Sequence, residues 1–322
     1  MFYWYYLRMK LSIVLPIFNE AKSIPELFEG IRSTMKEIGY PYEVIAVNDG
    51  SKDDSATRLN DIANTRPEVK VIHFRVNAGQ TAAIHAGIEH ATGEIIIPLD
   101  SDLENDPKDI IRMLKKMEEG FDVVSGWRKK RWADKRFGRK IPSIVANKLI
   151  SRISGVHLHD YGCTLKAYRA DVIQGVNLYG EMHRFIPAYA ARMGARVTEI
   201  EVSYTPRKYG KSNYGFSRTL RVLLDLLVLQ FLYKYMDRPI QFFGTIGFFF
   251  VSVGVLAGLG AIALRVFEDV SMIQTPLPTL SALCIIVGVQ LITMGILAEM
   301  VMRTYYESQG KKAYLIKEKI NF

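Results

Sequence analysis

Cysteine is scarce in this chain of 322 residues, which contains only Cys163 and Cys284. The pair offers no disulfide framework, because Cys284 falls inside a long apolar run and Cys163 does not, and this agrees with a reducing compartment. No glycine-rich dinucleotide fingerprint follows the first predicted strand, so nicotinamide chemistry is disfavoured. The net charge is +9, yet the signature of a nucleic-acid-binding module is missing, so no nucleic-acid partner is expected.

Two stretches near the carboxyl end lack charged residues, and they lie at 240–264 and 277–298. Each is long enough to cross a hydrocarbon layer of roughly 30 Å. A buried core helix is the alternative, and the length of the runs argues against it. We therefore expect two transmembrane helices, at about 240–264 and 277–302.

The basic residues around these runs predict their orientation. Lys234 and Arg238 precede the first run and several lysines follow the second, whereas the loop between them carries Arg265 against Glu268 and Asp269. Because positive charge is retained on the cytoplasmic side, both ends are expected in the cytoplasm. The sequence thus predicts an integral protein of the cytoplasmic (inner) membrane whose globular part faces the cytoplasm.

Strand and helix patterns alternate through the first 125 residues. Short apolar runs rich in β-branched residues predict strands, and apolar residues at helical spacing predict the segments between them. This alternation favours an α/β fold with a mostly parallel, doubly wound sheet. The predicted strands are 11–18, 42–47, 69–74, 95–97 and 121–125, and the predicted helices are 24–38, 55–64, 79–90 and 110–119.

Three of these strands end in polar turns that carry acids: Asn19-Glu20, Asn48-Asp49 and Asp100-Ser101-Asp102. Because the carboxyl ends of parallel strands lie at one edge, these side chains are expected to converge on one cleft. Two carboxylates with one residue between them suit a hard divalent cation that shares its shell with substrate phosphates. The alternative for the last turn is a solvated loop before a helix that starts at Asp106-Pro107.

Six motifs follow one another along the chain: Pro16-Ile17-Phe18-Asn19-Glu20, Asn48-Asp49-Gly50-Ser51, Asn77-Ala78-Gly79-Gln80, Asp100-Ser101-Asp102, Asp160-Tyr161-Gly162-Cys163 and Arg207-Lys208-Tyr209-Gly210-Lys211-Ser212. In this order they resemble the inverting glycosyltransferases of family 2, and in particular the polyprenyl-phosphate glycosyltransferases. The resemblance covers about residues 11 to 303 and implies the GT-A fold, which is Rossmann-like, in a cytoplasmic domain followed by two transmembrane helices.

The resemblance implies roles for residues on the donor side. Asp49 would accept a hydrogen bond from the base, Asp100 would contact the nucleotide and the metal, and Asp102 would be the principal ligand of Mg²⁺ or Mn²⁺. Glu104 stands where the family commonly has Gln, so it can still ligate the metal but adds a negative charge. The nucleoside would be held by Pro16, Asn19, Glu20 and Asp49.

On the acceptor side, the resemblance places four residues at the lipid phosphate, namely Arg128, Arg139, Ser143 and Arg207, with Lys211 as a weaker candidate. General attraction to lipid headgroups is the alternative for Arg128 and Arg139. Asp160 would lie near the donor sugar and the acceptor as a base, a contact to a sugar hydroxyl or a structural acid in a turn. The implied catalytic residues are Asp102, Asp160 and Arg207.

The chemistry agrees with these roles. A diphosphate leaving group needs its charge neutralised by a cation, and a lipid phosphate with a second pKa of about 6 is already mostly dianionic at neutral pH. No strong general base is required, and arginine suits the acceptor through its bidentate fork. We expect transfer of one sugar from a nucleotide-diphospho-sugar to a polyprenyl phosphate; a processive polysaccharide synthase and a non-catalytic membrane scaffold are the alternatives.

The expected organisation has five segments. The aromatic start is either an interfacial anchor or lies upstream of a true start at Met9, and Gly254 and Gly258 permit close helix packing within one protomer or in a homo-oligomer. The segments are an aromatic stretch at 1–10, a GT-A catalytic domain at 11–215 with a basic membrane-facing segment at 128–152, an amphipathic interface helix at 216–238, the two spans within 239–302, and a cytoplasmic tail at 303–322.

Overall fold

The computed structural model describes residues 10–132, 147, 150–152, 154–174, 184–208 and 239–308. The chain divides into two compact units, Met1–Leu229 and Gln230–Phe322, which are described separately. The predicted interface helix at 216–238 lies outside the described residues, and so does nearly all of the aromatic start. Most of the basic segment and of the tail does as well.

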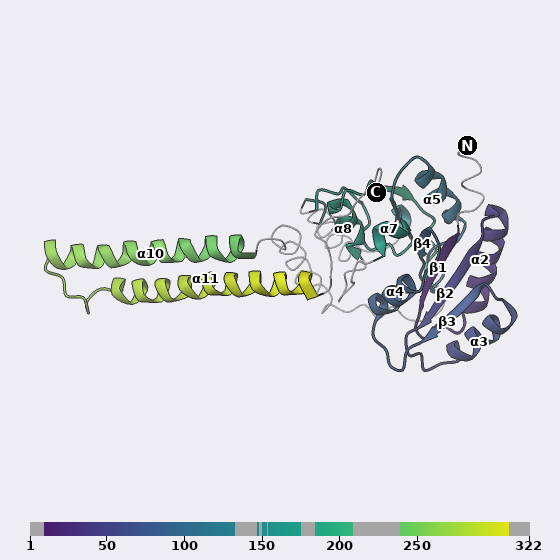
Figure 1. The fold of residues 1–322 in the computed structure, drawn as a ribbon, viewed down its shortest axis with the longest axis horizontal. Helices are drawn as coiled ribbons and strands as arrows, with labels where there is room; N and C mark the ends of the chain where they lie inside the picture. Colours follow the sequence, from purple (N-terminus) through teal and green to yellow (C-terminus); the bar gives the residue numbers. More distant parts are fainter. Residues whose placement is uncertain are drawn as a thin grey trace. The chain divides into compact units, whose positions relative to one another are not determined.

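The first unit is built on a mixed seven-stranded sheet in the order β3-β2-β1-β4-β6-β5-β7. Figure 1 labels four of these strands, β1 to β4. The first four strands in this order are parallel to one another, while β6 runs antiparallel to both β4 and β5. The strands are β1 (Leu11–Ile17), β2 (Tyr42–Asn48), β3 (Val69–His73), β4 (Ile95–Pro98), β5 (Val123–Trp127), β6 (Lys166–Arg169) and β7 (Val197–Glu201). The mostly parallel sheet is as predicted.

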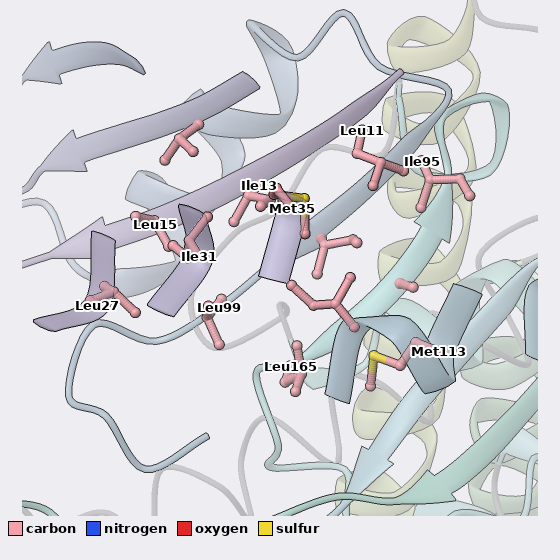
Figure 2. Packing of buried hydrophobic residues seen from close by; sticks show 14 of the residues in the cluster. Leu11, Ile13, Leu15, Leu27, Ile31, Met35, Ile95, Leu99, Met113 and Leu165 are labelled. Atoms are coloured by element: carbon pink, nitrogen blue, oxygen red, sulfur yellow. The ribbon is translucent and has the colours of Figure 1, made fainter. Parts of the chain in front are cut away.

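Helices cover both faces of this sheet, which explains why β1 is buried along its whole length and reads as an unbroken apolar run. Figure 2 shows side chains of β1 packed with those of α2 and α5 in the larger core. The second core includes side chains of α4, α7 and α8. The helices are α2 (Ile24–Ile38), α3 (Ser55–Thr65), α4 (Gln80–Glu89), α5 (Asp109–Glu118), α7 (Ala170–Ile173) and α8 (Ile186–Arg192), with a 3₁₀ turn η1 (Lys129–Trp132).

The sequence patterns located β1 to β5 and the four helices between them, but not β6 and β7. Strand β6 has the sequence Lys-Ala-Tyr-Arg, and the basic residues at its two ends hide the apolar signal of a central strand. Lys166 nevertheless has only 2% of its surface exposed. Residues 166–169 therefore form a strand because they pair with β4 and β5, and not because of their composition.

The described part of the second unit contains the helices α10 (Pro239–Phe267) and α11 (Leu277–Ser308), and each has a segment apolar and long enough to cross a membrane. Small residues seven apart on α10, namely Gly247, Gly254 and Ala261, are buried. The Ser281 hydroxyl of α11 donates a hydrogen bond to the Gly254 carbonyl oxygen at 2.7 Å. Gly254 therefore serves packing between the two helices of one chain, which was one of the two expectations for it.

Candidate active site

The turn after β4, residues 100–104, is called the acidic turn, and it is hydrogen-bonded to the end of β1. The Ser101 hydroxyl donates to the Pro16 carbonyl oxygen at 3.0 Å, and the Glu104 amide donates to Asp102 Oδ1 at 3.0 Å. Leu103 between them has a φ of 62°, a left-handed conformation that is uncommon outside glycine. The turn is therefore held in one shape, with the Asp102 carboxylate tied to the turn's own backbone.

The ends of β1 and β2 are joined in a similar way. The Asp49 amide donates to the Ile17 carbonyl oxygen at 2.8 Å. Asn19, at a φ of 55°, accepts a hydrogen bond from the Lys52 amide at 2.8 Å, while the Glu20 amide donates to the Ser55 hydroxyl at 3.1 Å. These bonds bring the predicted nucleoside-binding residues to the same edge of the sheet as the acidic turn.

Asp49 is buried and binds a neighbouring loop. Its carboxylate accepts hydrogen bonds from the Asn77 side chain at 2.9 Å, from the Ala78 amide at 2.6 Å and from the Gly79 amide at 3.0 Å. A Cβ atom at Gly50 would lie 2.6 Å from the Asn77 backbone nitrogen, so only glycine permits this approach. The predicted acceptor for the base thus also shapes the loop at 77–79.

Arg207 contacts the acidic turn, whereas the resemblance implied a place for it at the acceptor phosphate. Its Nη2 lies 2.6 Å from Asp102 Oδ2, and its Nη1 lies 4.0 Å from Glu20 Oε1. The Thr205 amide also donates to the Glu104 carbonyl oxygen at 3.0 Å, which anchors the backbone before Arg207. Burial raises the pKa of Glu20, and the charge of Arg207 offsets this only in part.

Arg128 is buried and forms ion pairs with two carboxylates. Its Nε donates to Asp160 Oδ2 at 2.8 Å, its Nη2 donates to Asp160 Oδ1 at 3.3 Å, and its Nη1 lies 3.5 Å from Glu104 Oε2. Burial alone would raise the pKa of Asp160, but Arg128 outweighs this and leaves that pKa below its ordinary value. Arg128 therefore links the turn at Asp160 to the acidic turn.

Asp100 is hydrogen-bonded to Gln80, a motif residue to which the sequence analysis gave no role. Gln80 Nε2 donates to Asp100 Oδ1 at 2.7 Å and lies 3.5 Å from the Thr164 hydroxyl. Burial, and next the charge of Asp102, raise the pKa of Asp100 to about 6. The glutamine of the Asn77-Ala78-Gly79-Gln80 motif was the signal that could have indicated this contact.

The predicted metal ligands Asp100, Asp102 and Glu104 all lie on the acidic turn. The described part of the chain contains no group of three or more His, Cys, Asp or Glu side chains placed to hold a metal ion. Glu104 is instead beside Arg128. Asp100 and Asp102 still fit Mg²⁺ or Mn²⁺, because such ions are commonly held by one or two carboxylates together with water and substrate phosphates.

Three predicted acceptor residues, Arg139, Ser143 and Lys211, lie outside the described residues. Among those that are described, the structure brings Glu20, Asp102 and Arg207 together in one group. It brings Arg128, Asp160 and Glu104 together in a second group, and Asp102 and Glu104 are two residues apart on the same turn. The predicted site residues of the donor and acceptor sides therefore meet at the acidic turn.

The fold of the first unit recurs in solved structures. Glucosyl-3-phosphoglycerate synthase from Mycobacterium tuberculosis, in complex with Mn²⁺ and uridine-diphosphate-glucose, is similar at a TM-score of 0.55 and 16% identity, over 69% of this chain and 79% of that one. The same enzyme in complex with phosphoglyceric acid matches at a TM-score of 0.53 and 17% identity, over 68% of this chain and 79% of that one. The first unit thus has the GT-A fold, the predicted class.

The family model for glycosyl transferase family 2 matches residues 12–176. Dodecaprenyl-phosphate galacturonate synthase from Rhizobium johnstonii is 42% identical over 96% of this chain and 93% of the relative. Undecaprenyl-phosphate 4-deoxy-4-formamido-L-arabinose transferase from Proteus mirabilis is 35% identical over 96% of this chain and 93% of the relative. The chain therefore belongs to glycosyl transferase family 2 and is a glycosyltransferase, and the relatives are of the polyprenyl-phosphate group that the motifs predict.

Proposed function

We propose that this protein transfers a single sugar, with inversion at the anomeric carbon, from a nucleotide-diphospho-sugar to a polyprenyl phosphate. The observation that carries this proposal is the contact between Arg207 and Asp102 at 2.6 Å. The Asp102 carboxylate suits the metal ion of a bound diphosphate, and the Arg207 guanidinium suits a second phosphate. The two side chains are in direct contact. Two anionic substrates can therefore be brought together there.

On the donor side, Asp100 and Asp102 would hold Mg²⁺ or Mn²⁺, which supplies positive charge to the leaving diphosphate when it is bound. Asp49 and the loop that it orders at 77–79 would form the nucleoside pocket. Asn19 and Glu20 support this pocket through their bonds to the segment after β2. The chain's own residues thus position the donor with its diphosphate over the acidic turn.

In the transfer step, the bond between the anomeric carbon and the diphosphate oxygen breaks, and its electron pair leaves with the nucleoside diphosphate. An oxygen of the acceptor phosphate forms the new bond to that carbon. No proton has to be removed, because the acceptor is mostly dianionic at neutral pH. Asp160 is ion-paired with Arg128 and has a lowered pKa, which supports a positioning role for it rather than that of a general base.

The relatives suggest where to begin with the substrates. The more similar of the two named relatives makes dodecaprenyl-phosphate galacturonate, and the other transfers 4-deoxy-4-formamido-L-arabinose to undecaprenyl phosphate. We infer a bacterial polyprenyl phosphate as the acceptor and an acidic or modified sugar as the first donor to test. The reaction would take place at the cytoplasmic face of the cytoplasmic membrane, with α10 and α11 as the membrane anchor.

The test is a transfer assay with full-length protein purified in detergent. The protein is incubated with Mn²⁺, undecaprenyl phosphate and one nucleotide donor at a time. The donors include uridine-diphosphate-galacturonate, uridine-diphosphate-glucose and guanosine-diphosphate-mannose. The lipid products are identified by mass spectrometry. We expect a product with one sugar for at least one donor, and none for Asp102→Ala. A donor panel that gives no lipid-linked sugar would refute the proposal, and a product with several sugars would indicate a processive synthase instead.

A further inference from the structure

Lys166 is a buried ammonium group that the proposed mechanism does not use. It is the first residue of β6, an interior strand of the sheet between β4 and β5, and has 2% of its surface exposed. Lysine is almost never fully buried unless it is paired, because removing the charge from water is costly. Burial accordingly lowers the pKa of Lys166 to about 8. A charge kept at this cost needs an explanation.

The partners of Lys166 are backbone carbonyls of a turn that leads into its own strand. Its Nζ donates to the Cys163 carbonyl oxygen and to the Tyr161 carbonyl oxygen, the latter at 3.3 Å. The same turn is closed at its start by the Gly162 amide, which donates to Asp160 Oδ1 at 3.0 Å. The ammonium therefore holds together the turn at residues 160–164.

Two chains of contacts run from this turn to the acidic turn. At one end, Asp160 binds Arg128, and Arg128 lies 3.5 Å from Glu104. At the other end, the Thr164 hydroxyl lies 3.5 Å from Gln80, which donates to Asp100 at 2.7 Å. The two chains reach opposite ends of the acidic turn, at Glu104 and at Asp100. A shift of the turn at 160–164 would be transmitted to both.

We propose that Lys166 is a positioning residue for sugar transfer, whose ammonium fixes the turn at 160–164 and through it the placement of Asp100, Arg128 and Glu104. This inference rests on the proposed function. An ammonium has three donors and can serve two carbonyl oxygens at once. Methionine has a similar length and no donor, whereas arginine keeps the charge and several donors.

The test compares Lys166→Met and Lys166→Arg in the full-length protein. A misplacement of about 1 Å can cost about 100-fold in rate, so we expect Lys166→Met to lower kcat by about that factor and Lys166→Arg to recover most of it. The affinity for uridine diphosphate with Mn²⁺, measured by calorimetry, should fall in Lys166→Met as well. This second readout does not need an acceptor, so it tests the inference even if transfer to polyprenyl phosphate is disproved.

The matched control is Lys70→Met, because Lys70 also binds a buried partner in the sheet but lies at β3, on the carboxylate of Glu43. We expect Lys70→Met to lower the melting temperature without changing kcat or nucleotide affinity. If Lys166→Met folds and keeps wild-type kcat and nucleotide affinity, or if Lys70→Met loses them equally, Lys166 is only a structural residue.

A second variant covers the case in which Lys166→Met does not fold. Thr164→Val removes the hydroxyl that meets Gln80 and leaves Lys166 unchanged. We expect lower nucleotide affinity in the presence of Mn²⁺ and lower kcat, with a melting temperature close to that of the wild type. Unchanged values in Thr164→Val would overturn the inferred connection between the turn at 160–164 and Asp100.

Discussion

Arg207 is the one side chain for which we propose a contact with both substrates. Its guanidinium lies on Asp102, where the donor's diphosphate is proposed to bind, and its planar fork also suits the phosphate of the acceptor. Arg207→Ala is expected to lower kcat/KM for the lipid acceptor by about 100-fold, the usual scale for removing one charge-stabilising donor. Arg207→Lys should recover only part of this, because an ammonium lacks the bidentate geometry.

The matched control for Arg207 is the residue that follows it. Lys208 binds Glu26 on α2 at 2.8 Å and does not contact the acidic turn through that bond. Lys208→Ala should therefore leave kcat/KM within about threefold of the wild type, since exposed ion pairs contribute little. Steady-state kinetics at varied acceptor concentration measure kcat/KM for both variants. An equal loss of kcat/KM in Arg207→Ala and Lys208→Ala would contradict the role given to Arg207.

Glu43 shows that a buried carboxylate can be purely structural. It accepts hydrogen bonds from Ser12 at 2.6 Å and from the Thr92 amide at 2.7 Å, and its Oε2 lies 2.6 Å from Lys70 Nζ. Burial alone would raise the pKa of Glu43, but these partners outweigh it and leave that pKa far below the ordinary value. The residue lies at the start of β2, at the opposite end of the strand from Asp49.

The lowered pKa of Glu43 determines how it affects stability. The ionised form is favoured in the folded state, so its contribution is fully present above the ordinary pKa of a glutamate and is lost as the pH falls below it. Glu43→Gln should lower the free energy of unfolding at pH 7 by about 2 kcal/mol. The free energy of unfolding of the variant should also fall less between pH 7 and pH 4 than that of the wild type. Denaturant unfolding at pH 7 and pH 4 measures both effects, and a variant as stable as the wild type at pH 7 would contradict this.

At the scale of elements, the loop after β3 depends on the turn after β2. Gly50 has a φ of 65° and a backbone neighbour 2.6 Å from where a Cβ would lie. Gly39 at the end of α2 has a φ of 76°, and no atom of the described residues lies within 4 Å of the corresponding position. Both glycines avoid backbone strain, but only Gly50 also permits a close contact. The two positions therefore separate strain from the packing of the loop at 77–79.

Gly50→Ala is expected to lower the free energy of unfolding by about 2 kcal/mol or more and to weaken nucleotide binding at least tenfold. Gly39→Ala should show the strain alone, about 1 kcal/mol, with nucleotide affinity unchanged. Thermal unfolding and calorimetry with uridine diphosphate provide the two measurements. A Gly50→Ala variant with wild-type nucleotide affinity would show that the loop held by Asp49 does not form the nucleoside pocket.

At the scale of the whole molecule, the proposed topology places the loop between α10 and α11 outside the cytoplasm. Ser271 lies in this loop, and both native cysteines are buried. Ser271→Cys in intact cells should react with a membrane-impermeant maleimide, whereas Lys36→Cys, at an exposed position of α2 in the first unit, should react only after the cells are opened. The reverse labelling pattern would contradict the orientation predicted from the flanking charges.

The sequence by itself determined the first five strands, the helices between them and the two apolar helices, because β-branched runs, helical spacing and uncharged length are local signals. It also identified the acids at the ends of β1, β2 and β4, since parallel strands place these ends at one edge. Only the tertiary structure decided that Arg128 faces Asp160 and Glu104, that Asp49 orders the loop at 77–79, and that Lys166 is buried in a central strand. These features depend on contacts between residues far apart in the chain, where burial and neighbouring charges decide which partner each charged group takes.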